Sequence, residues 1–527
     1  MSAVRINGTT VLVDNTGEDY DLMQDSPTQN YATGNPLDFV VGNPSPSFNF
    51  SKANLSGVGA QAGLYHGFAS IAISADDTNT YYMEFSSPQA SGGYPGAFIA
   101  QVGANPWWTD GLIWSAQSNA VSYNLVTQTP WTGATYTANA VAGFSYNGST
   151  GVITGYVDGV EAGTFTADTG IDRVFGVLAP PQNITVMDFN YGQRPFVHQP
   201  DGTVALQTQN LPAAPIANGR DHFQAITGPG ADILTDAQDV FDNGLWWIKD
   251  RANSNQHQFV DSFRPDNSAL TCPERNTTPI AYDPPDGNSV AWCWSCPDTF
   301  TPAVTGGPTV NDARRNVEAG FSMIDSTAPN TGATYTIEHG LNAPVDFMLM
   351  KSRTSTSTWT VYHRSLGPTG RLRMDNAEAF QVNSAFFDDT DPDATNITLG
   401  STFSNGDTSV LYAWASVPGY SAFGRYNGNA TTNNSFVFTD FRPAWIMFKS
   451  IAAGGNWQIY DTTRSPHNPT RHFLSPNNTL AETAGFDIDI LSNGFKIRAS
   501  NGPSAAATGA VWCAFAENPF QAPVTSR

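Results

Sequence analysis

Three short apolar runs follow one another in the last part of the chain, and this trio occurs three times. The first runs are Leu245–Lys249, Phe347–Lys351 and Trp445–Lys449; the second runs are Gln256–Asp261, Thr358–His363 and Asn456–Asp461; the third runs are Val290–Trp294, Val410–Trp414 and Ala510–Phe515. From the lysine of each first run, the offset to Val260, Tyr362 or Tyr460 is 11 residues in every copy. A repeated unit folds in the same way each time, so this repeat constrains the fold more than any other feature.

Each run has the length and pattern of a β-strand. Trp457 and Ile459 alternate with polar neighbours, as do Trp359 and Val361, which is the period of a half-buried strand. Clusters of Gly, Asn, Pro, Thr and Ser, the residues that form turns, separate the runs. A unit of about 100 residues can enclose its own core. We therefore predict three related β-sandwich-type domains in series, in which the repeated lysine is a snorkelling or edge-blunting residue.

The composition favours an all-β chain. The 527 residues include 47 Gly and 35 Pro, and the strongest helix candidate is the short stretch Asn311–Ala319. With 24 Lys and Arg against 46 Asp and Glu, the formal net charge is −22. This charge disfavours nucleic-acid binding by phosphate neutralisation and contact with anionic membranes. No apolar stretch reaches the roughly 20 residues of a membrane-spanning helix, so we expect no membrane insertion.

The chain has four cysteines, Cys272, Cys293, Cys296 and Cys513. Cys293 and Cys296 form a C-x-x-C motif, which suggests either redox chemistry near a βαβ unit or half of a zinc site. Here the motif ends a β-run, and no second Cys/His pair has a suitable spacing. Our alignment of the third runs places Cys293 opposite Ala413 and Cys513. We interpret Cys293 and Cys296 as structural thiols, either free or joined in a local disulfide.

The chain before the repeats divides into an arm and a sandwich. Residues 1–36 are polar and too few to build a core, and we weigh a flexible terminus against an arm that docks onto other particle proteins. Residues 37–197 carry short apolar runs separated by turn signals, the pattern of a β-sandwich. The remaining predicted bounds are 198–300 for a linker and repeat 1, 301–420 for repeat 2 and 421–527 for repeat 3.

The sandwich segment resembles the SPRY/concanavalin-like family. The matching stretches are Tyr81–Phe85, Gly96–Ala100, Ala142–Tyr146, Gly151–Gly159 and the closing strand Phe189–Phe196. The resemblance implies a protein or glycan ligand, bound by loops at one end of the sandwich, and no catalysis. Adjacent Trp107 and Trp108 with Asp110, and also Trp131, are the candidate ligand-binding residues, because an indole in a loop offers a flat face to a sugar ring. The alternative is that these indoles fold back onto the sandwich.

An acidic cluster in the second repeat is a candidate cation site. Asp388, Asp389, Asp391 and Asp393 bring several hard oxygen ligands together, which suits Ca²⁺. The cluster lacks the Gly and the distal Glu of an EF-hand, and an Asp-rich turn explains it equally. We predict no other cofactor.

We find no catalytic constellation in the sequence and expect no enzymatic activity. Asp487 and Asp489 alternate in a strand-like run and would share a face, as a glycan hydrolase would require of its carboxylates. Asp261 and Asp461 occupy matching repeat positions, but the second copy has His363 there, which argues against a shared mechanism. The Asp-x-x-Arg pattern that follows both aspartates favours a tethering ion pair at a turn.

The repeats resemble a module of tail-fibre and virion proteins from marine tailed phages. The matching phrases are Phe441–Lys449, Asn456–Asp461, Leu491–Arg498 and Phe515–Phe520. The resemblance implies a tail fibre that binds a host-surface receptor, a glycan or a protein, and that assembles as a homo-trimer. The alternatives are a capsid-decorating or adaptor protein that binds other virion chains, and a polysaccharide-degrading tailspike. Residues 1–20 show no signal peptide, so we expect the protein in the virion and, after lysis, outside the cell.

Overall fold

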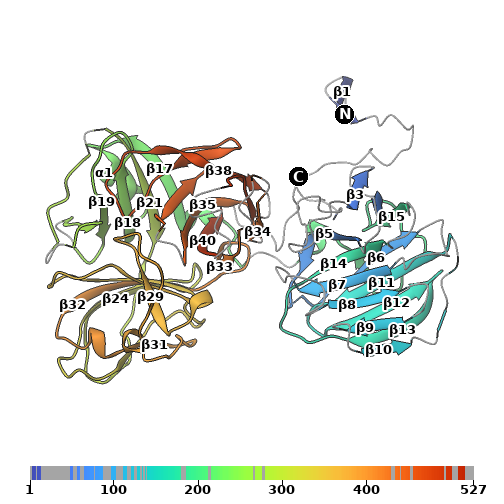
Figure 1. Cartoon of the computed structure of the whole chain (residues 1–527), viewed down its shortest axis with the longest axis horizontal. Helices are drawn as coiled ribbons and strands as arrows, with labels where there is room; N and C mark the ends of the chain where they lie inside the picture. The colour runs from blue at the N-terminus through green and yellow to red at the C-terminus, as the bar shows by residue number, and fades with distance from the viewer. Residues whose placement is uncertain are drawn as a thin grey trace. The chain divides into compact units, whose positions relative to one another are not determined.

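A computed structural model shows two compact units, and we describe each by itself. The sandwich unit comprises Met1–Ala213 with Gln521–Arg527, and the repeat unit comprises Ala214–Phe520. The structure describes residues 3–6, 9–12, 32, 48–51, 56–59, 65–75, 77–86, 96–101, 111–115, 120–123, 127–130, 133–134, 137, 139–179, 186–211, 215–264, 267–275, 279–285, 287–428, 432, 434–439, 441–451, 455–491, 494–500 and 509–516. The all-β prediction is confirmed, since the units are built from β-sheets (Figure 1). No helix in the described ranges is long and apolar enough to cross a membrane.

The sandwich unit contains two antiparallel sheets. The first sheet has the order β10 (Thr127–Pro130), β9 (Ala120–Tyr123), β8 (Gly111–Ser115), β7 (Gly96–Gln101), β14 (Arg173–Ala179) and β5 (Tyr65–Ile73). The second has the order β13 (Val160–Thr166), β12 (Val152–Val157), β11 (Val141–Asn147), β6 (Thr80–Ser86), β15 (Val186–Asn190), β4 (Ser56–Gly59) and β3 (Phe48–Ser51). A short strand, β16 (Thr203–Ala205), pairs in parallel with the start of β6. The predicted sandwich is therefore present.

Alternation along the strands of the second sheet sets which side chains face the core. In β11, Phe144 points into the sandwich and its ring lies 6.0 Å from that of Phe175, which comes from the other sheet. Ser145 and Asn147 therefore point to the opposite, outer face, because successive side chains in a strand alternate. The same rule places Thr154 and Tyr156 of β12 on this outer face.

The three repeats form three sheets with one strand order. Copy 1 has β17 (Phe223–Pro229), β21 (Asn288–Ser295), β18 (Gly244–Asp250), β19 (His257–Asp261) and β20 (Leu270–Cys272). Copy 2 has β25 (Phe321–Thr327), β32 (Thr408–Trp414), β27 (Phe347–Ser352), β28 (Thr360–His363) and β29 (Gly370–Arg373). Copy 3 has β33 (Ser421–Tyr426), β40 (Ala510–Ala516), β35 (Pro443–Ser450) and β36 (Gln458–Asp461). The three apolar runs are therefore equivalent strands in every copy, as the repeat predicted.

Each copy covers the outer face of its sheet differently. Copy 1 uses the helix α1 (Ile233–Val240), which packs on the sheet through a separate apolar cluster. Copy 2 uses a three-stranded sheet of β23 (Val304–Thr305), β26 (Tyr335–Glu338) and β31 (Asn396–Leu399). Copy 3 uses β34 (Phe436–Phe438), β39 (Gly494–Ile497), β38 (Thr483–Leu491) and β37 (Thr470–Phe473). Copies 2 and 3 are thus sandwiches, while copy 1 is a sheet with a helix.

The helix predicted at Asn311–Ala319 is wrong. Residues up to Asn316 belong to β24 (Thr309–Asn316), which pairs along its length with β25. Cross-strand pairing overrides the weak helical pattern of this polar segment. The helix that exists, α1, was missed because its eight residues are too few to show a helical period.

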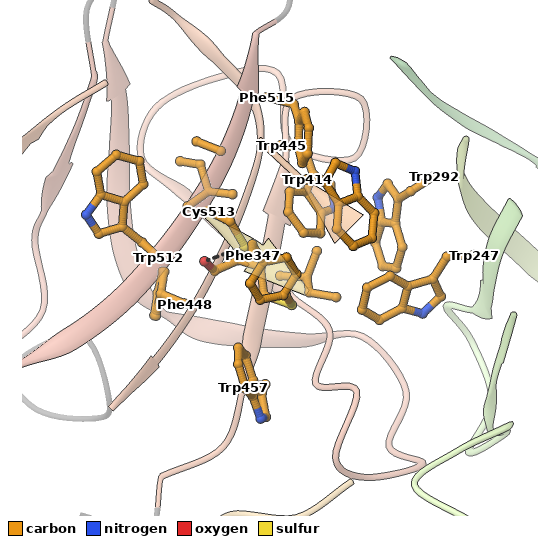
Figure 2. Packing of buried hydrophobic residues seen from close by; sticks show 14 of the residues in the cluster. Trp247, Trp292, Phe347, Trp414, Trp445, Phe448, Trp457, Trp512, Cys513 and Phe515 are labelled. Carbon is orange, nitrogen blue, oxygen red and sulfur yellow. Dashed lines mark hydrogen bonds between the residues drawn. The ribbon is translucent and has the colours of Figure 1, made fainter. Parts of the chain in front are cut away.

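The inner faces of the three sheets pack on one shared hydrophobic core. The indole of Trp445 lies 6.4 Å from Trp247 and 5.7 Å from Trp294, ring centre to ring centre, so copies 1 and 3 are in direct contact. Trp414 of copy 2 lies 5.8 Å from the same Trp294. Figure 2 shows Trp247, Trp414 and Trp445 gathered in this core. The copies are therefore three sheets around one centre (green, yellow-orange and red in Figure 1) rather than independent beads.

Strand register defines which residues are equivalent between copies. Lys249 lies opposite Val290, Lys351 opposite Val410 and Lys449 opposite Val511. It follows that Trp292, Tyr412 and Cys513 occupy one equivalent position. Cys293 matches Ala413 and Ala514, so the sequence alignment that placed Cys513 opposite Cys293 was off by one residue.

Candidate functional site

A hollow opens on the outer face of the second sheet of the sandwich unit. Its volume is 390 Å³, and it lies over β6, β11 and β12. The lining residues are Thr80, Ser145, Asn147, Thr150, Val152, Thr154, Tyr156, Asp201, Gly202 and Thr203. Most of them carry a hydroxyl or amide group, so the hollow is a polar surface made by strands rather than by loops at one end of the sandwich.

Two hydroxyl side chains in this hollow make no hydrogen bond to any described residue. They belong to Ser145 and Thr154, which are 3% and 8% exposed as residues and line the hollow. Their hydroxyl groups are therefore available to a ligand or to water. Tyr156 adds a half-buried aromatic ring and a phenol beside them, and Asp201 adds an exposed carboxylate.

The wall of the hollow is fixed by the segment that follows the last strand of the sandwich. The Glu84 carboxylate accepts hydrogen bonds from the backbone N–H groups of Val197 (3.0 Å) and His198 (2.7 Å). The Tyr82 hydroxyl donates to the His198 carbonyl at 3.1 Å. Gly143 permits this arrangement, because a Cβ there would lie 2.1 Å from the Tyr82 hydroxyl oxygen. Burial raises the pKa of Tyr82, helped by the negative charge of Glu84, so the phenol stays protonated and keeps donating.

Asn147 positions the hollow rather than offering it a free group. Its side-chain nitrogen donates to the carbonyl of Thr78 (2.8 Å), and its oxygen accepts from the backbone N–H of Thr150 (2.9 Å). These bonds hold the turn between β11 and β12. The hollow was not predicted, because its residues come from strands far apart in sequence and share no motif.

The predicted ligand-binding residues of the sandwich, Trp107, Trp108, Asp110 and Trp131, lie outside the described residues. Their role as a glycan-facing loop therefore stays a prediction.

The predicted calcium ligands are exposed, and two of them already accept hydrogen bonds from groups within the protein. Asp391 accepts a hydrogen bond from the Tyr362 hydroxyl at 2.7 Å. Asp393 accepts from the backbone N–H groups of Thr395 and Asn396 at 2.7 and 2.6 Å, as in an Asp-rich turn. These hydrogen bonds lower the pKa of Asp393. Within the described part of the chain, no three His, Cys, Asp or Glu side chains are grouped to hold a metal ion. The geometry of Asp388, Asp389 and their neighbours gives the calcium prediction no support.

The paired carboxylates considered for hydrolysis are bound to arginines. Asp487 pairs with Arg471 at 2.9 Å and Asp489 with Arg498 at 3.1 Å, both at the surface of copy 3. Each of the two carboxylates is therefore engaged by its own guanidinium group.

The repeat positions Asp261, His363 and Asp461 join neighbouring copies. Asp261 of copy 1 accepts a hydrogen bond from the Tyr412 hydroxyl of copy 2. His363 of copy 2 donates to the Trp512 carbonyl of copy 3 at 3.1 Å, and Asp461 of copy 3 accepts from the Trp292 indole of copy 1 at 2.9 Å. The contacts run from copy 1 to 2, from 2 to 3 and from 3 back to 1, so the three repeats close into a ring.

We call these contacts between neighbouring copies the seams. The two aspartates at the seams, Asp261 and Asp461, also form the predicted tethering ion pairs. Arg264 binds Asp261 and Arg464 binds Asp461, both at 2.6 Å, and all four side chains are almost fully buried. The same guanidinium groups donate to the carbonyls of the second-run strands, at Phe259 and Ile459, both at 2.9 Å. Identical contacts in two copies identify these groups as structural.

A second set of contacts joins two of the three pairs of copies in the opposite sense. The Trp359 indole donates to the Thr271 carbonyl of copy 1 at 2.9 Å. The Trp457 indole donates to the Arg373 carbonyl of copy 2 at 2.7 Å. His257 takes the equivalent position in copy 1, but its Nδ1 accepts a hydrogen bond from the Trp247 indole of the same copy at 3.0 Å, and its Nε2 has no hydrogen-bond partner among the described residues. Each copy is therefore held by both of its neighbours.

The repeated lysines are buried, contrary to our prediction that they snorkel or blunt an edge. Lys249, Lys351 and Lys449 are at most 1% exposed and lie on interior strands. Each ammonium donates to the carbonyl of the following residue, at 2.7, 2.9 and 2.9 Å. Burial lowers the pKa of each lysine to about 8.

The four cysteines are buried free thiols, so the C-x-x-C motif holds no disulfide. Burial raises the pKa of the Cys293 and Cys296 thiols, which makes them unreactive.

Comparisons with known proteins match parts of this chain. Residues 282–519 match the model of a family described as a domain of unknown function (DUF7483), which spans copies 2 and 3 and strand β21 of copy 1. No curated protein matches the chain.

Three solved domains are similar in structure. The SPRY domain of human HERC1 has 12% identity and a TM-score of 0.23, covering 27% of this chain and 91% of that domain. The TRIM65 PSpry domain has 9% identity and a TM-score of 0.23, covering 31% and 90%. The carbohydrate-binding module CBM66 from Bacillus subtilis has 11% identity and a TM-score of 0.21, covering 31% and 93%. These TM-scores are too low to carry an argument, so the sandwich is defined by its own strands and core.

Proposed function

We propose that this chain is a non-enzymatic receptor-binding protein of a tailed phage, a tail-fibre component that holds the particle to a glycan on the host surface. The observation that carries the binding part is the hollow of the sandwich unit, whose Ser145 and Thr154 hydroxyls make no hydrogen bond to a described residue. A sugar offers hydroxyls that donate and accept in the same way, and its apolar face suits the ring of Tyr156.

The composition of the hollow favours a neutral ligand and argues against hydrolysis. Asp201 is the one carboxylate among the lining residues, whereas glycoside hydrolysis ordinarily uses two. The phage part of the proposal is supported by the sequence resemblance of the repeats. Assembly as a homo-trimer also stays a prediction, although the repeat unit already makes threefold contacts within one chain.

The alternative, an adaptor that binds other virion chains, is favoured by one feature of the first 36 residues. Strands β1 (Ala3–Ile6) and β2 (Thr9–Leu12) form a two-stranded hairpin, and within the described ranges they pair only with each other. A two-stranded hairpin is marginally stable in water, so it gains from adding to a sheet of a partner. We propose this hairpin as the docking arm in either case.

A glycan array with the purified full chain tests the proposal. We expect binding to neutral glycans that Thr154→Val, which removes one lining hydroxyl at constant shape, weakens about tenfold. The matched control is Thr164→Val, because Thr164 lies directly opposite Thr154 on β13, is exposed and does not line the hollow. Equal glycan binding by Thr154→Val and Thr164→Val would show that the hollow is not the glycan site. No binding to any glycan or host-surface extract would favour the adaptor.

A further inference from the structure

Three arginines come together where copy 1 meets copy 2. Arg371 and Arg373 lie on β29 of copy 2 and point to the same face, because they are two residues apart in a strand. Arg275 follows β20 of copy 1 and forms an ion pair with the buried carboxylate of Asp375. Asp375 follows the end of β29 by two residues, so its ion pair with Arg275 brings Arg275 beside the end of the strand that carries Arg371 and Arg373.

Comparison of equivalent positions in the three copies shows that the repeat fold does not require these arginines. Register matches Leu372 with Leu270 and Leu474. The residues equivalent to Arg371 are therefore Ala269 and Phe473, and those equivalent to Arg373 are Thr271 and Ser475. The fold is built in the other two copies without these arginines. By contrast, the lysines and seam contacts that the fold uses recur around the ring.

Few contacts within the protein occupy these arginines. Arg371 donates to the Thr360 hydroxyl at 2.8 Å and stacks 4.0 Å above the ring of Phe386. Arg373 binds Glu378 at 3.0 Å through one terminal nitrogen. Arg275 binds Asp375 through Nε, so both of its terminal nitrogens lack a hydrogen-bond partner among the described residues. The Nε atoms of Arg371 and Arg373 are buried and equally without a described partner.

The cluster carries surplus positive charge inside an acidic protein. Arg275 and Arg373 each pair with one carboxylate, Asp375 and Glu378, whereas the described contacts of Arg371 include no carboxylate, in a chain of net charge −22. Burial lowers the pKa of Arg371 to about 10, and the like charges of Arg373 and Arg275 add to this effect. Lys351 also lies within the field of Asp375 and Arg275. An added anion would relieve this repulsion.

The cluster is open to solvent on the side of Arg275. That side chain is 41% exposed and that of Arg373 is 20% exposed. Guanidinium groups bind oxyanions through parallel N–H···O bonds, with a strength and geometry that lysine does not match. The overall negative charge of the chain repels densely charged polyanions, but screening within about 8 Å permits a short-range contact with one group.

We propose that Arg275, Arg371 and Arg373 form a binding site for a single oxyanion group, a sulfate, phosphate or carboxylate. Its source is either a sparsely charged acidic sugar or the free ion. The site lies in the repeat unit and does not depend on the hollow of the sandwich unit.

Isothermal titration calorimetry on the full chain tests this site, at constant ionic strength. The probes are inorganic sulfate, glucose 6-sulfate and glucuronate, with glucose as the uncharged reference. We expect one equivalent of an oxyanion probe to bind and glucose not to bind at this site. Binding of the free ion alone assigns the site to inorganic oxyanions, while binding of the charged sugars assigns it to acidic glycans.

The variants decide whether these arginines are responsible. Arg275→Gln with Arg373→Gln keeps a polar side chain and removes the charge, and we expect affinity to fall about 10- to 100-fold. The matched control is Arg471→Gln, an exposed arginine paired with Asp487 in copy 3, which should bind as the wild type does. If the double variant does not fold, Arg275→Gln alone decides, because its side chain is half exposed. Absence of binding by every oxyanion, or equal affinity in wild type and variant, would overturn the proposal.

Discussion

The seams of the repeat unit and the hollow of the sandwich unit handle polar groups in opposite ways. At the seams, Asp261, His363 and Asp461 are each bonded to the next copy, and a similar contact recurs three times. In the hollow, the Ser145 and Thr154 side chains make no hydrogen bond to a described residue, and they do not belong to the repeats. The difference teaches that a polar group that recurs and is bonded between copies belongs to the scaffold, whereas one that makes no bond within the protein is a candidate for ligand contact.

The largest expected effect comes from breaking one seam. Asp261→Ala leaves Arg264 buried without its counter-ion and removes the acceptor of the Tyr412 hydroxyl. Removing one partner of a buried pair costs about 3–5 kcal/mol of unfolding free energy. Chemical denaturation measures this loss. Asp487→Ala is the control, since its pair with Arg471 is exposed and we expect a cost of at most about 1 kcal/mol.

Acid should weaken the seam between copies 2 and 3. Burial lowers the pKa of His363 to about 4, below its ordinary value of 6.5. The neutral imidazole is therefore favoured in the folded state, and its stability contribution is complete above pH 6.5 and lost as the pH falls to about 4. His363→Gln keeps a donor for the Trp512 carbonyl and cannot titrate. It should recover about 3 kcal/mol of this acid-dependent loss in denaturation curves at pH 4 relative to pH 7. An unchanged pH dependence would contradict the assignment.

A buried lysine should cost stability at neutral pH. Burial lowers the pKa of Lys449 from 10.5 to about 8, so below pH 8 the folded state holds an ammonium that the unfolded state solvates better. Lys449→Met should raise the unfolding free energy by about 2 kcal/mol at pH 7. The gain should shrink between pH 8 and 10.5, where folding releases the proton. A variant that is less stable at pH 7 would show that the bond to the Ser450 carbonyl outweighs desolvation.

The smallest expected effect lies in the hollow. The hydroxyl of Ser145 has no described partner, so Ser145→Ala should change the unfolding free energy by no more than about 0.5 kcal/mol. Glycan binding by the same variant should weaken. A loss of stability comparable to that of a seam variant would place Ser145 in the scaffold and remove the contrast between the two regions.

The sequence was sufficient to predict the strands of the repeats but not their closure. Leu245, Trp246, Trp247 and Ile248 are consecutive apolar residues, and such runs indicate a strand that is buried on both faces. Our sequence analysis predicted half-buried strands in separate sandwiches and so did not include a layer on each side of the sheet. The shared core forms by packing between segments about 100 residues apart. The apolar pattern within one strand does not indicate which distant segments pack against it.

The candidate sites were harder to predict than the fold. Ser145, Thr154 and Asp201 look like ordinary outward residues of a sandwich, and only the chain around His198 turns them into a hollow. Arg275 lies beside the end of β29 only because its ion pair with Asp375 joins copies 1 and 2, which are distant in sequence. The tryptophan pair that we predicted to bind a glycan, Trp107 and Trp108, lies outside the described residues.

Hydrogen exchange in the Asp261→Ala variant tests most directly whether the three copies form one closed cooperative body. The residue lies at the seam of copies 1 and 2, while β35 and β36 belong to copy 3. If the ring unfolds as a unit, amide protection in β35 and β36 should fall by the same free energy as in β18 and β19. If amide protection falls in copy 1 but stays at the wild-type level in copy 3, the ring is contradicted and the copies are independent domains.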